Sequence, residues 1–513
     1  MKKIIIYTLA IAAAFCLPAC KKFLDVQPLD KLTGNNFFKS KEDVIANIYD
    51  LSRIVFGKFN ETHFIGATGE YRSGEVQYES QSDHASARAF VDVLGKNDLL
   101  YLLSNPNPWG SGDGNINYNF GRITDWKGYY QAIQGANILI AKLDEGIPGV
   151  TDAEKDAFKA EAAFIRSLSY FIMVRLYGDV VYYTDAFHSV PLPRENFVSV
   201  LNKCIADLKT HKDKIAWTYT DPSIKGVRAG RGSIVALMME MNMWNAGFDA
   251  PNAAKYYRET ADLGKELVAS NAFRLLPITE WATVVKGRSD ESLFEFYRSI
   301  NYGDVNTNLA PVADMFLHYP FKRPEYTHRV SFAYYRGEYM QKIFQDGSDR
   351  RITTWFDEDI FADNGKFMML KFAQNSFATG EEDANPDNTF MIFRYGGEIL
   401  LAAEALAELG EDGDAIRLLN MVRDRAQASR YSGGGGTALK DFIFYERSRE
   451  LIGEGHHYFD LVRTKRILSN QWSYNVLTAD KFNRGAWTWP LNASARNNNP
   501  FIVLNDYWVN GGN

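Results

Sequence analysis

Three carboxylates follow one another at intervals of four residues near the end of this 513-residue chain: Glu446, Glu450 and Glu454. That spacing places all three on one face of a helix. Two carboxyl groups held about 5 Å or about 6.5–9.5 Å apart could act as the acid pair of a glycoside hydrolase. Arg447 and Arg449 alternate with these residues, however, and favour ion pairs that lock the segment against a buried core. We therefore expect a structural role for the three carboxylates.

The adjacent residues His456 and His457 are the next candidates for chemistry, as metal ligands. Neighbouring residues on a helix point about 100° apart, so the two rings cannot bind one metal as a pair four residues apart would. No Cys and no third His lies nearby in the sequence. We expect no metal site here, and we predict a structural role for the pair at the start of a helix.

Other catalytic patterns are absent from the sequence. No Gly-rich phosphate loop follows a predicted strand, and no G-x-S-x-G motif occurs. Asp113-Gly114-Asn115 is typical of a turn, and its neighbours lack the ligand spacing of a calcium loop. The net charge is −6 with no long run of one sign, which argues against a nucleic-acid partner. The sequence predicts no catalytic residue and no cofactor.

A signal-like pattern at the N-terminus ends at Cys20. Two lysines precede an apolar run over residues 4–17, which is too short for a membrane-spanning helix of roughly 20 residues. This is the pattern of an export signal. Because Cys20 follows a small residue, the segment resembles a bacterial lipoprotein signal, in which that Cys is acylated. We expect a signal peptide over residues 1–19 and a lipid anchor with an extended leader over residues 20–40; an ordinary signal cleaved nearby is the alternative.

The other two cysteines, Cys16 and Cys204, have different expected places in the protein. Cys16 would leave with the signal, so Cys204 would have no partner for an intrachain disulfide. A lone thiol in an exported protein could be reactive, but a buried Cys on a helix face is more frequent. We predict a buried Cys204.

Helical periodicity dominates the chain after the leader. Apolar spacing predicts helices over residues 41–56, 126–143 and 153–176. Two later helix pairs repeat one another, since each position of the second lies 162 residues after its counterpart, as Ile399 does after Leu237. Their pattern of small and bulky residues matches a tetratricopeptide unit of about 34 residues, and such units must stack to bury their apolar faces. The sequence predicts a mainly α protein with tetratricopeptide-like helices over about 126–176, 232–268, 395–428 and 438–468.

Two long segments, about 57–125 and 273–393, lack this periodicity. They contain many aromatic residues separated by Gly, Asn, Pro and Ser, which is typical of loops. Long irregular segments inside a compact protein are usually functional. We expect them to form an irregular, loop-rich ligand-binding face.

Five blocks of sequence occur in a specific order along almost the whole chain. They are LDVQP after Cys20, EAAFIRSLSYFIMVRLYG over 161–178, the segment 393–426, ERSRELIGEGHHYFDLVR over 446–463, and a closing segment over 489–508. Together they resemble the SusD/RagB family of Bacteroidetes outer-membrane lipoproteins. The resemblance implies one domain over residues 41–513, built as a helical superhelix with an irregular ligand face.

The resemblance also implies a function and a partner. Members of this family sit on the cell surface, capture glycans or in some cases peptides, and deliver them to a TonB-dependent transporter barrel. It thus implies a lipid-anchored protein of the outer membrane that binds an oligosaccharide for a SusC-like transporter, without cleaving it. A peptide-binding lid of the same architecture and, less favoured, a surface glycosidase are the alternatives.

Binding of a sugar requires aromatic rings that stack on its apolar face, and amide or charged side chains that bond paired hydroxyls. Those residue types cluster in the two irregular segments, although each aromatic taken singly is more simply explained as sealing a loop onto the helices. By type and location, the candidate ligand residues are Arg72, Asn105, Asn107, Trp109, Tyr297, Asn301, Tyr302 and Trp355.

Overall fold

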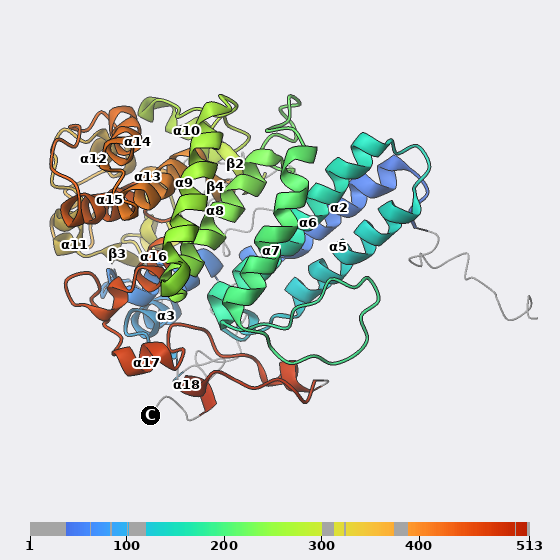
Figure 1. The fold of residues 1–513 in the computed structure, drawn as a ribbon. Coiled ribbons are helices and arrows are strands. Elements are labelled where there is room, and N and C mark those ends of the chain that lie inside the picture. Colours follow the sequence, from blue (N-terminus) through green and yellow to red (C-terminus); the bar gives the residue numbers. More distant parts are fainter. Residues whose placement is uncertain are drawn as a thin grey trace, which may run out of the picture.

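The structure, a computed structural model, describes residues 37–61, 63–82, 85–99, 101, 120–299, 312–322, 325–373, 388–497 and 499–509. Within these residues helices dominate and the strands are short (Figure 1). The predicted signal peptide and Cys20 lie outside the described residues. None of the described helices is long and apolar enough to cross a membrane.

Antiparallel helices stacked side by side form the main body (Figure 1). In chain order, each helix packs on the next from α5 to α9, then α9 packs on α13, and α13 packs on α14 and α15. Each helix pair thereby covers the apolar face of its neighbour. The predicted superhelix of tetratricopeptide-like repeats is confirmed. Its helices are α2 (Lys41–Phe59), α5 (Lys127–Glu145), α6 (Asp152–Tyr177), α7 (Phe197–His211), α8 (Arg231–Phe248), α9 (Ala253–Ala269), α13 (Tyr395–Glu408), α14 (Asp412–Arg425), α15 (Thr437–Glu450) and α16 (His457–Arg463).

Local side-chain chemistry determines where several of these helices begin and end. The Thr151 hydroxyl accepts from the Glu154 amide at the start of α6, and the Glu154 carboxylate accepts from the Thr151 amide at 3.0 Å. This capping box satisfies amide groups that have no partner inside the helix. At the other end, Gly178 takes a φ of +74°, which favours glycine and stops the helix. Ser40 and Asp43 form the same box before α2.

The two predicted repeat pairs, α8–α9 and α13–α14, meet through small residues. A Cβ added to Gly264 on α9 would overlap the Cβ of Ala402 on α13. The absence of side-chain bulk at Gly264 therefore allows the two pairs to approach closely and bury their apolar faces against each other.

Helix α7 is an element that the predicted helices do not include. Asn196 caps it, with the side-chain oxygen accepting from the amide of Val198 at 3.0 Å. One face of α7 is buried, and it includes Cys204, whose thiol pKa is raised by burial to about 12. The predicted buried Cys204 is confirmed. Apolar residues at Val200, Cys204 and Leu208 follow helical spacing, so the signal for α7 was present in the sequence.

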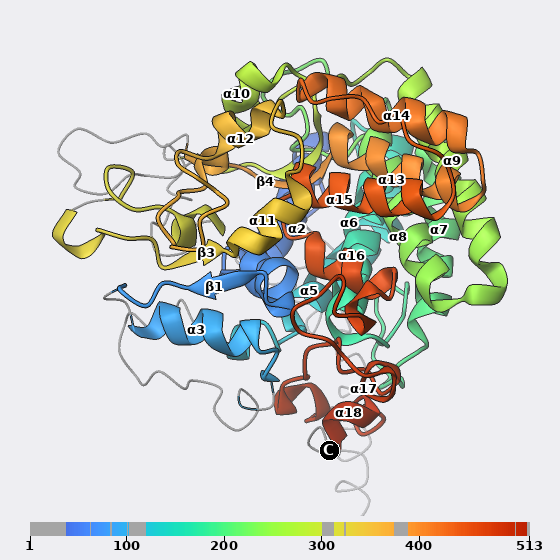
Figure 2. The same cartoon turned by 90° about the vertical axis from the view of Figure 1, so that its left-hand side faces the viewer.

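The two irregular segments contain short elements that form a loop layer beside the stack. Figure 2 shows α3, β1, β3, α11 and α12 together on one side of the helices. Strand β1 pairs with β3 in antiparallel register, with Gln77 opposite Tyr334, and so joins the two segments. A second antiparallel pair, β2 with β4, lies against α8. The elements are α3 (Ala85–Gly95), α10 (Trp281–Lys286), α11 (Gly337–Ile343), α12 (Arg350–Trp355), β1 (Val76–Tyr78), β2 (Ser292–Phe296), β3 (Ala333–Tyr335) and β4 (Phe390–Arg394).

The three carboxylates at intervals of four residues lie in a buried network of ion pairs. Glu450 accepts from Arg351 at 2.9 Å and from Arg394 at 2.6 Å, and it also pairs with Arg425. Burial alone would raise the pKa of Glu450, but the surrounding guanidinium groups hold it well below its usual range. The predicted structural role of this face is confirmed by these contacts.

Glu446 and Glu454 complete the network. Glu446 pairs with Arg351 and Arg423, each at 2.7 Å, and Glu454 pairs with Arg394 at 2.7 Å. Arg447 and Arg449 alternate with the three carboxylates in the sequence. Of the two, only Arg449 pairs with one of these carboxylates, at 2.8 Å from Glu446. Arg447 lies on a different side of the helix and pairs with Asp460 at 3.0 Å.

The histidine pair also has a structural place. His456 precedes α16 and His457 is its first residue, as predicted. Nε2 of His457 lies 3.2 Å from the Glu75 carboxylate, which connects the start of α16 to the segment before β1. Among the described residues, no group of three or more His, Cys, Asp or Glu side chains converges in a way that could hold a metal ion.

Candidate functional site

Three of the eight predicted ligand residues, Arg72, Tyr297 and Trp355, are part of the described structure. Tyr297 is half-buried, and its ring centroid lies 3.6 Å from the Arg288 guanidinium. Its role in ligand binding stays a prediction. The other five lie outside the described residues: Asn105, Asn107, Trp109, Asn301 and Tyr302.

Arg72 and Trp355 are buried and do not reach the surface. Arg72, 1% exposed, donates to the Trp487 carbonyl at 2.9 Å, and its guanidinium lies 4.3 Å from the centroid of the Tyr458 ring. Trp355 is 0% exposed and lies under the Lys371 ammonium group, 4.4 Å from the ring centroid. Arg and Trp side chains can either bind a sugar or pack in a core. Here the contacts of both residues hold the core together. We therefore leave both residues out of the candidate site.

A groove of about 340 Å³ lies in the loop layer where β1, α3 and β3 meet. We call it the β1–β3 groove. Its volume is within the range of ligand sites, about 300–1,000 Å³. The lining side chains that offer rings or polar groups are Gln77, Tyr78, Ser80, Asp92, Lys96, Tyr334 and Arg336.

The two strands position the aromatic and amide groups of this groove. On β3, Tyr335 points into the core, while its neighbour Tyr334 is half-exposed, because successive side chains of a strand face opposite ways. On β1, Tyr78 is 41% exposed. With its amide oxygen toward Arg336, Gln77 accepts from Nη1 of that residue at 2.8 Å and donates to the Tyr334 hydroxyl at 3.0 Å. The groove therefore presents the half-exposed ring of Tyr334 beside an ordered amide, and the exposed Tyr78 also lines it.

The two cations that line the β1–β3 groove already have partners. Nζ of Lys96 lies 2.7 Å from the Asp92 carboxylate. Nε of Arg336 donates to the Gly74 carbonyl at 2.7 Å, and its guanidinium lies 4.9 Å from the centroid of the Tyr474 ring. These pairings favour a neutral ligand over an anionic one.

A buried carboxyl group supports the groove from below. Oε2 of Glu70 accepts from the Tyr335 hydroxyl at 3.0 Å, and Oε1 accepts from the Gly455 amide at 2.7 Å. Burial raises the pKa of Glu70 to about 7, although Gly455, Tyr335 and nearby cations favour its charged form. Glu70 thus connects β3 to the segment before α16.

We expect Glu70→Gln to change how stability depends on pH. Between its ordinary pKa of 4.5 and about 7, the carboxyl of Glu70 keeps its proton in the folded protein and loses it in the unfolded one. Its contribution to wild-type stability is therefore present below pH 4.5 and lost as the pH rises toward 7. Gln has no such proton, so the stability of the variant relative to wild type should improve by about 3 kcal/mol from pH 5 to pH 8.

Urea unfolding at both pH values measures this change. Glu338→Gln, at an exposed position on α11, controls for the loss of one charge. If the free energies of unfolding of Glu70→Gln and wild type differ by the same amount at the two pH values, a titrating Glu70 is ruled out.

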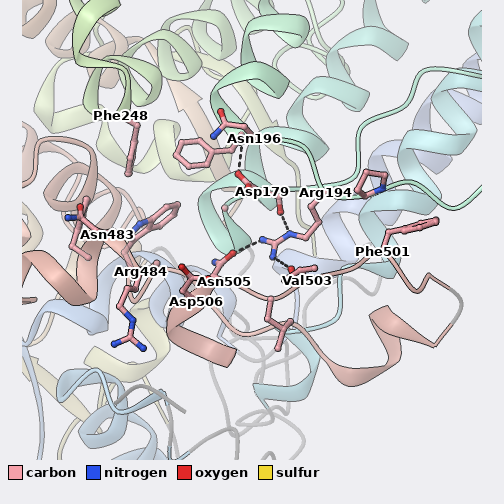
Figure 3. A pocket seen from close by; sticks show the side chains of 17 residues that line it. Asp179, Arg194, Asn196, Phe248, Asn483, Arg484, Phe501, Val503, Asn505 and Asp506 are labelled. Atoms are coloured by element: carbon pink, nitrogen blue, oxygen red, sulfur yellow. Dashed lines mark hydrogen bonds between the residues drawn. The ribbon is translucent and has the colours of Figure 1, made fainter. Parts of the chain in front are cut away.

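A second and larger cavity, of about 500 Å³, lies at the C-terminal end of the described chain (Figure 3). We call it the C-terminal pocket. The loop before α7, the end of α8, the short helix α17 (Ala479–Asn483) and residues 501–506 surround it. Among the described residues, the C-terminal pocket and the β1–β3 groove share no lining residue.

Arg194 and Asn505 hold the walls of the C-terminal pocket together (Figure 3). Arg194 donates to the carbonyls of Tyr177, Asp179 and Val503, each at 2.6 Å, and to the side chain of Asn505 at 2.8 Å. Asn505 in turn donates to the Tyr177 carbonyl at 3.1 Å. Of the predicted ligand residues that the structure describes, Arg72, Tyr297 and Trp355, none lines either cavity.

The fold and the groove define a class of protein: a stack of tetratricopeptide-like helices that carries a loop layer with a ligand-sized groove. The SusD family model matches residues 322–508, and a model described as "Starch-binding associating with outer membrane" matches residues 22–229. A solved SusD homolog from Bacteroides thetaiotaomicron is 37% identical, with a TM-score of 0.82, and the match covers 91% of this chain and 98% of that chain. The chain belongs to the SusD family.

More distant relatives share the length and the fold. A SusD-like protein of Formosa agariphila is 24% identical, with 96% of each chain covered. Surface glycan-binding protein A from Bacteroides uniformis is 20% identical with a TM-score of 0.67, and a laminarin-binding SusD-like protein is 20% identical with a TM-score of 0.68. Both matches cover 91% of this chain and 99% of the solved chain. At this identity the two solved structures establish the fold alone.

Proposed function

We propose that this protein is a cell-surface lipoprotein that captures a neutral oligosaccharide and delivers it to a SusC-like TonB-dependent transporter. The observation that carries the proposal is the β1–β3 groove, whose lining includes the exposed Tyr78, the half-exposed Tyr334 and the amide side chain of Gln77. Rings bind the apolar face of a sugar, and an amide both donates to and accepts from its hydroxyls.

The relatives support a glycan as the ligand. One matching family model is described as starch-binding, and two solved proteins of this fold bind glycans by name, one of them laminarin. The same family model is described as associating with the outer membrane, which supports the proposed location. The lipid would be attached at Cys20, with residues 21–34 as the tether.

Tyr78→Ala and Tyr334→Ala are each expected to weaken oligosaccharide binding by about tenfold. Each change removes one ring that would stack on a sugar, together with the apolar area that the ring would bury. Isothermal titration of the two variants with maltoheptaose and laminarihexaose measures the change.

Tyr49→Ala is the matched control, because Tyr49 is an exposed tyrosine on α2, outside the loop layer. The control should bind as wild type does. Wild-type affinity in both groove variants would place the glycan site elsewhere, and binding of peptides without any glycan binding would favour the peptide-binding alternative. Release of reducing ends from the bound glycan would favour the glycosidase alternative.

A further inference from the structure

We propose that the C-terminal pocket is a second, separate saccharide site. This site goes beyond the proposed capture of glycan in the β1–β3 groove, with which it shares no lining residue in the part of the chain that the structure describes. Its volume of about 500 Å³ is typical of small-ligand sites.

The walls of the C-terminal pocket are fixed without a ligand. Asn505 is held by Arg194 at 2.8 Å, by the Tyr177 carbonyl at 3.1 Å and by the Thr488 hydroxyl at 2.9 Å. Gly485 takes a φ of +91°, and a Cβ there would lie 3.1 Å from the Cβ of Asn505. The glycine thus permits the close approach of the C-terminal segment. A preformed cavity costs little ordering on binding.

One side of the C-terminal pocket is a wall of aromatic rings. The rings of Phe248 and Phe482 are stacked, with centroids 5.9 Å apart and planes 6° apart. Phe248 also contacts the rings of Trp487, at 5.2 Å, and Phe197, at 5.0 Å. Phe248 is only half-buried, so part of its ring faces the cavity. An apolar surface of this kind suits the face of a sugar ring.

Several polar groups that line the C-terminal pocket are available to a ligand. Asn483 and Asp506 are exposed, and their side chains make no hydrogen bond or ion pair within the described part of the chain (Figure 3). One oxygen of Asp179 accepts from the Phe197 amide at 2.9 Å, which leaves the other for a ligand. These groups offer several acceptors and an amide donor, a set that matches hydroxyl groups.

The charges of the C-terminal pocket favour a neutral ligand over an anion. Arg194 directs its guanidinium donors to three carbonyls and an amide oxygen, and the carboxylates of Asp179 and Asp506 lie nearby. Arg484 also lines the pocket, and its guanidinium lies 3.6 Å from the Asp480 carboxylate. An anionic ligand would therefore meet two carboxylates and two guanidinium groups that already have partners. The chemistry that fits both the rings and the acceptors is a neutral, polyhydroxylated ring.

The double variant Asn483→Ala with Asp506→Ala tests the second site. With maltoheptaose and laminarihexaose as probes, wild type should bind two molecules of at least one of them, and the ligand should slow hydrogen exchange of segments 482–487 and 503–508. The double variant should lose that protection, and affinity at this site should fall by at least about tenfold. Lys481→Ala, an exposed change on α17 that does not line the pocket, should behave as wild type.

The outcomes separate this site from the proposed groove. Protection that is confined to segments 76–96 and 333–336, with one molecule bound, would overturn the second site and leave the groove. Ligand-induced protection of segments 482–487 and 503–508 that persists in Tyr78→Ala but is lost in the double variant would establish the second site independently. No protection in either region would overturn both assignments. An unchanged thermal midpoint shows that the double variant is folded.

Discussion

Glu450→Gln is expected to lower the free energy of unfolding by about 3–5 kcal/mol. The Glu450 carboxylate is fully buried and accepts from Arg351 and Arg394, and it also pairs with Arg425. Loss of the negative charge leaves three buried guanidinium groups without their shared partner. The desolvation cost of those cations remains while the attraction that offset it is gone.

Urea unfolding of purified protein measures this loss, and Glu408→Gln is the matched control. Glu408 pairs with Lys440 at 2.7 Å, but both side chains are about one-quarter exposed, so the change should cost at most about 1 kcal/mol. Glu450→Asp keeps the charge and should fall between the two if Glu450→Gln yields too little folded protein. Equal stability losses in Glu450→Gln and Glu408→Gln would contradict the role assigned to the buried network.

The helical stack could be predicted from the sequence because its determinants are local. The capping pair Thr151 and Glu154, the stop at Gly178 and the apolar stripe of α6 all lie within one continuous segment. The repeat was visible for the same reason, since small and bulky residues recur at fixed offsets. Even α7, which the prediction omitted, carries a local signal at Val200, Cys204 and Leu208.

The candidate site could not be predicted in the same way, because long-range pairing creates it. Gln77 meets Tyr334 only when β1 pairs with β3, and no local periodicity records that pairing. Burial also depends on distant contacts. Arg72 donates to the carbonyl of Trp487, more than 400 residues later, and is therefore a core residue and not a surface ligand residue. Residue types in the sequence indicated the chemistry of the site, but only the fold shows which residues form it.

The buried polar contacts also explain how the loop layer is held against the stack. Arg351 of α12 lies in the loop layer and pairs with Glu446 and Glu450 of α15. Behind the groove, the buried Tyr335 of β3 donates to Glu70, which also accepts from the Gly455 amide beside α16. Side chains locked by such contacts fix the groove before a ligand arrives, which reduces the ordering cost of binding.

Cys20→Ser is expected to release at least about nine-tenths of the protein from the membrane fraction. None of the described helices is long and apolar enough to cross a membrane, and the apolar run over residues 4–17 is shorter than a span of roughly 20 residues. If acylation of Cys20 supplies the anchor, its removal deletes the buried lipid chains, each CH₂ of which contributes about 0.8 kcal/mol. Fractionation after labelling with palmitate measures both the anchor and its attachment.

Cys16→Ser is the matched control, since Cys16 would leave with the signal peptide and should not affect labelling. A carbonate wash separates lipid anchoring from contact with a transporter, because the wash strips proteins held by protein contacts alone. Palmitate incorporation into Cys20→Ser, or retention after the wash equal to that of wild type, would show that the protein is not anchored through this residue. Capture at the cell surface would then require another means of attachment, because diffusion away from the cell would separate bound glycan from the transporter.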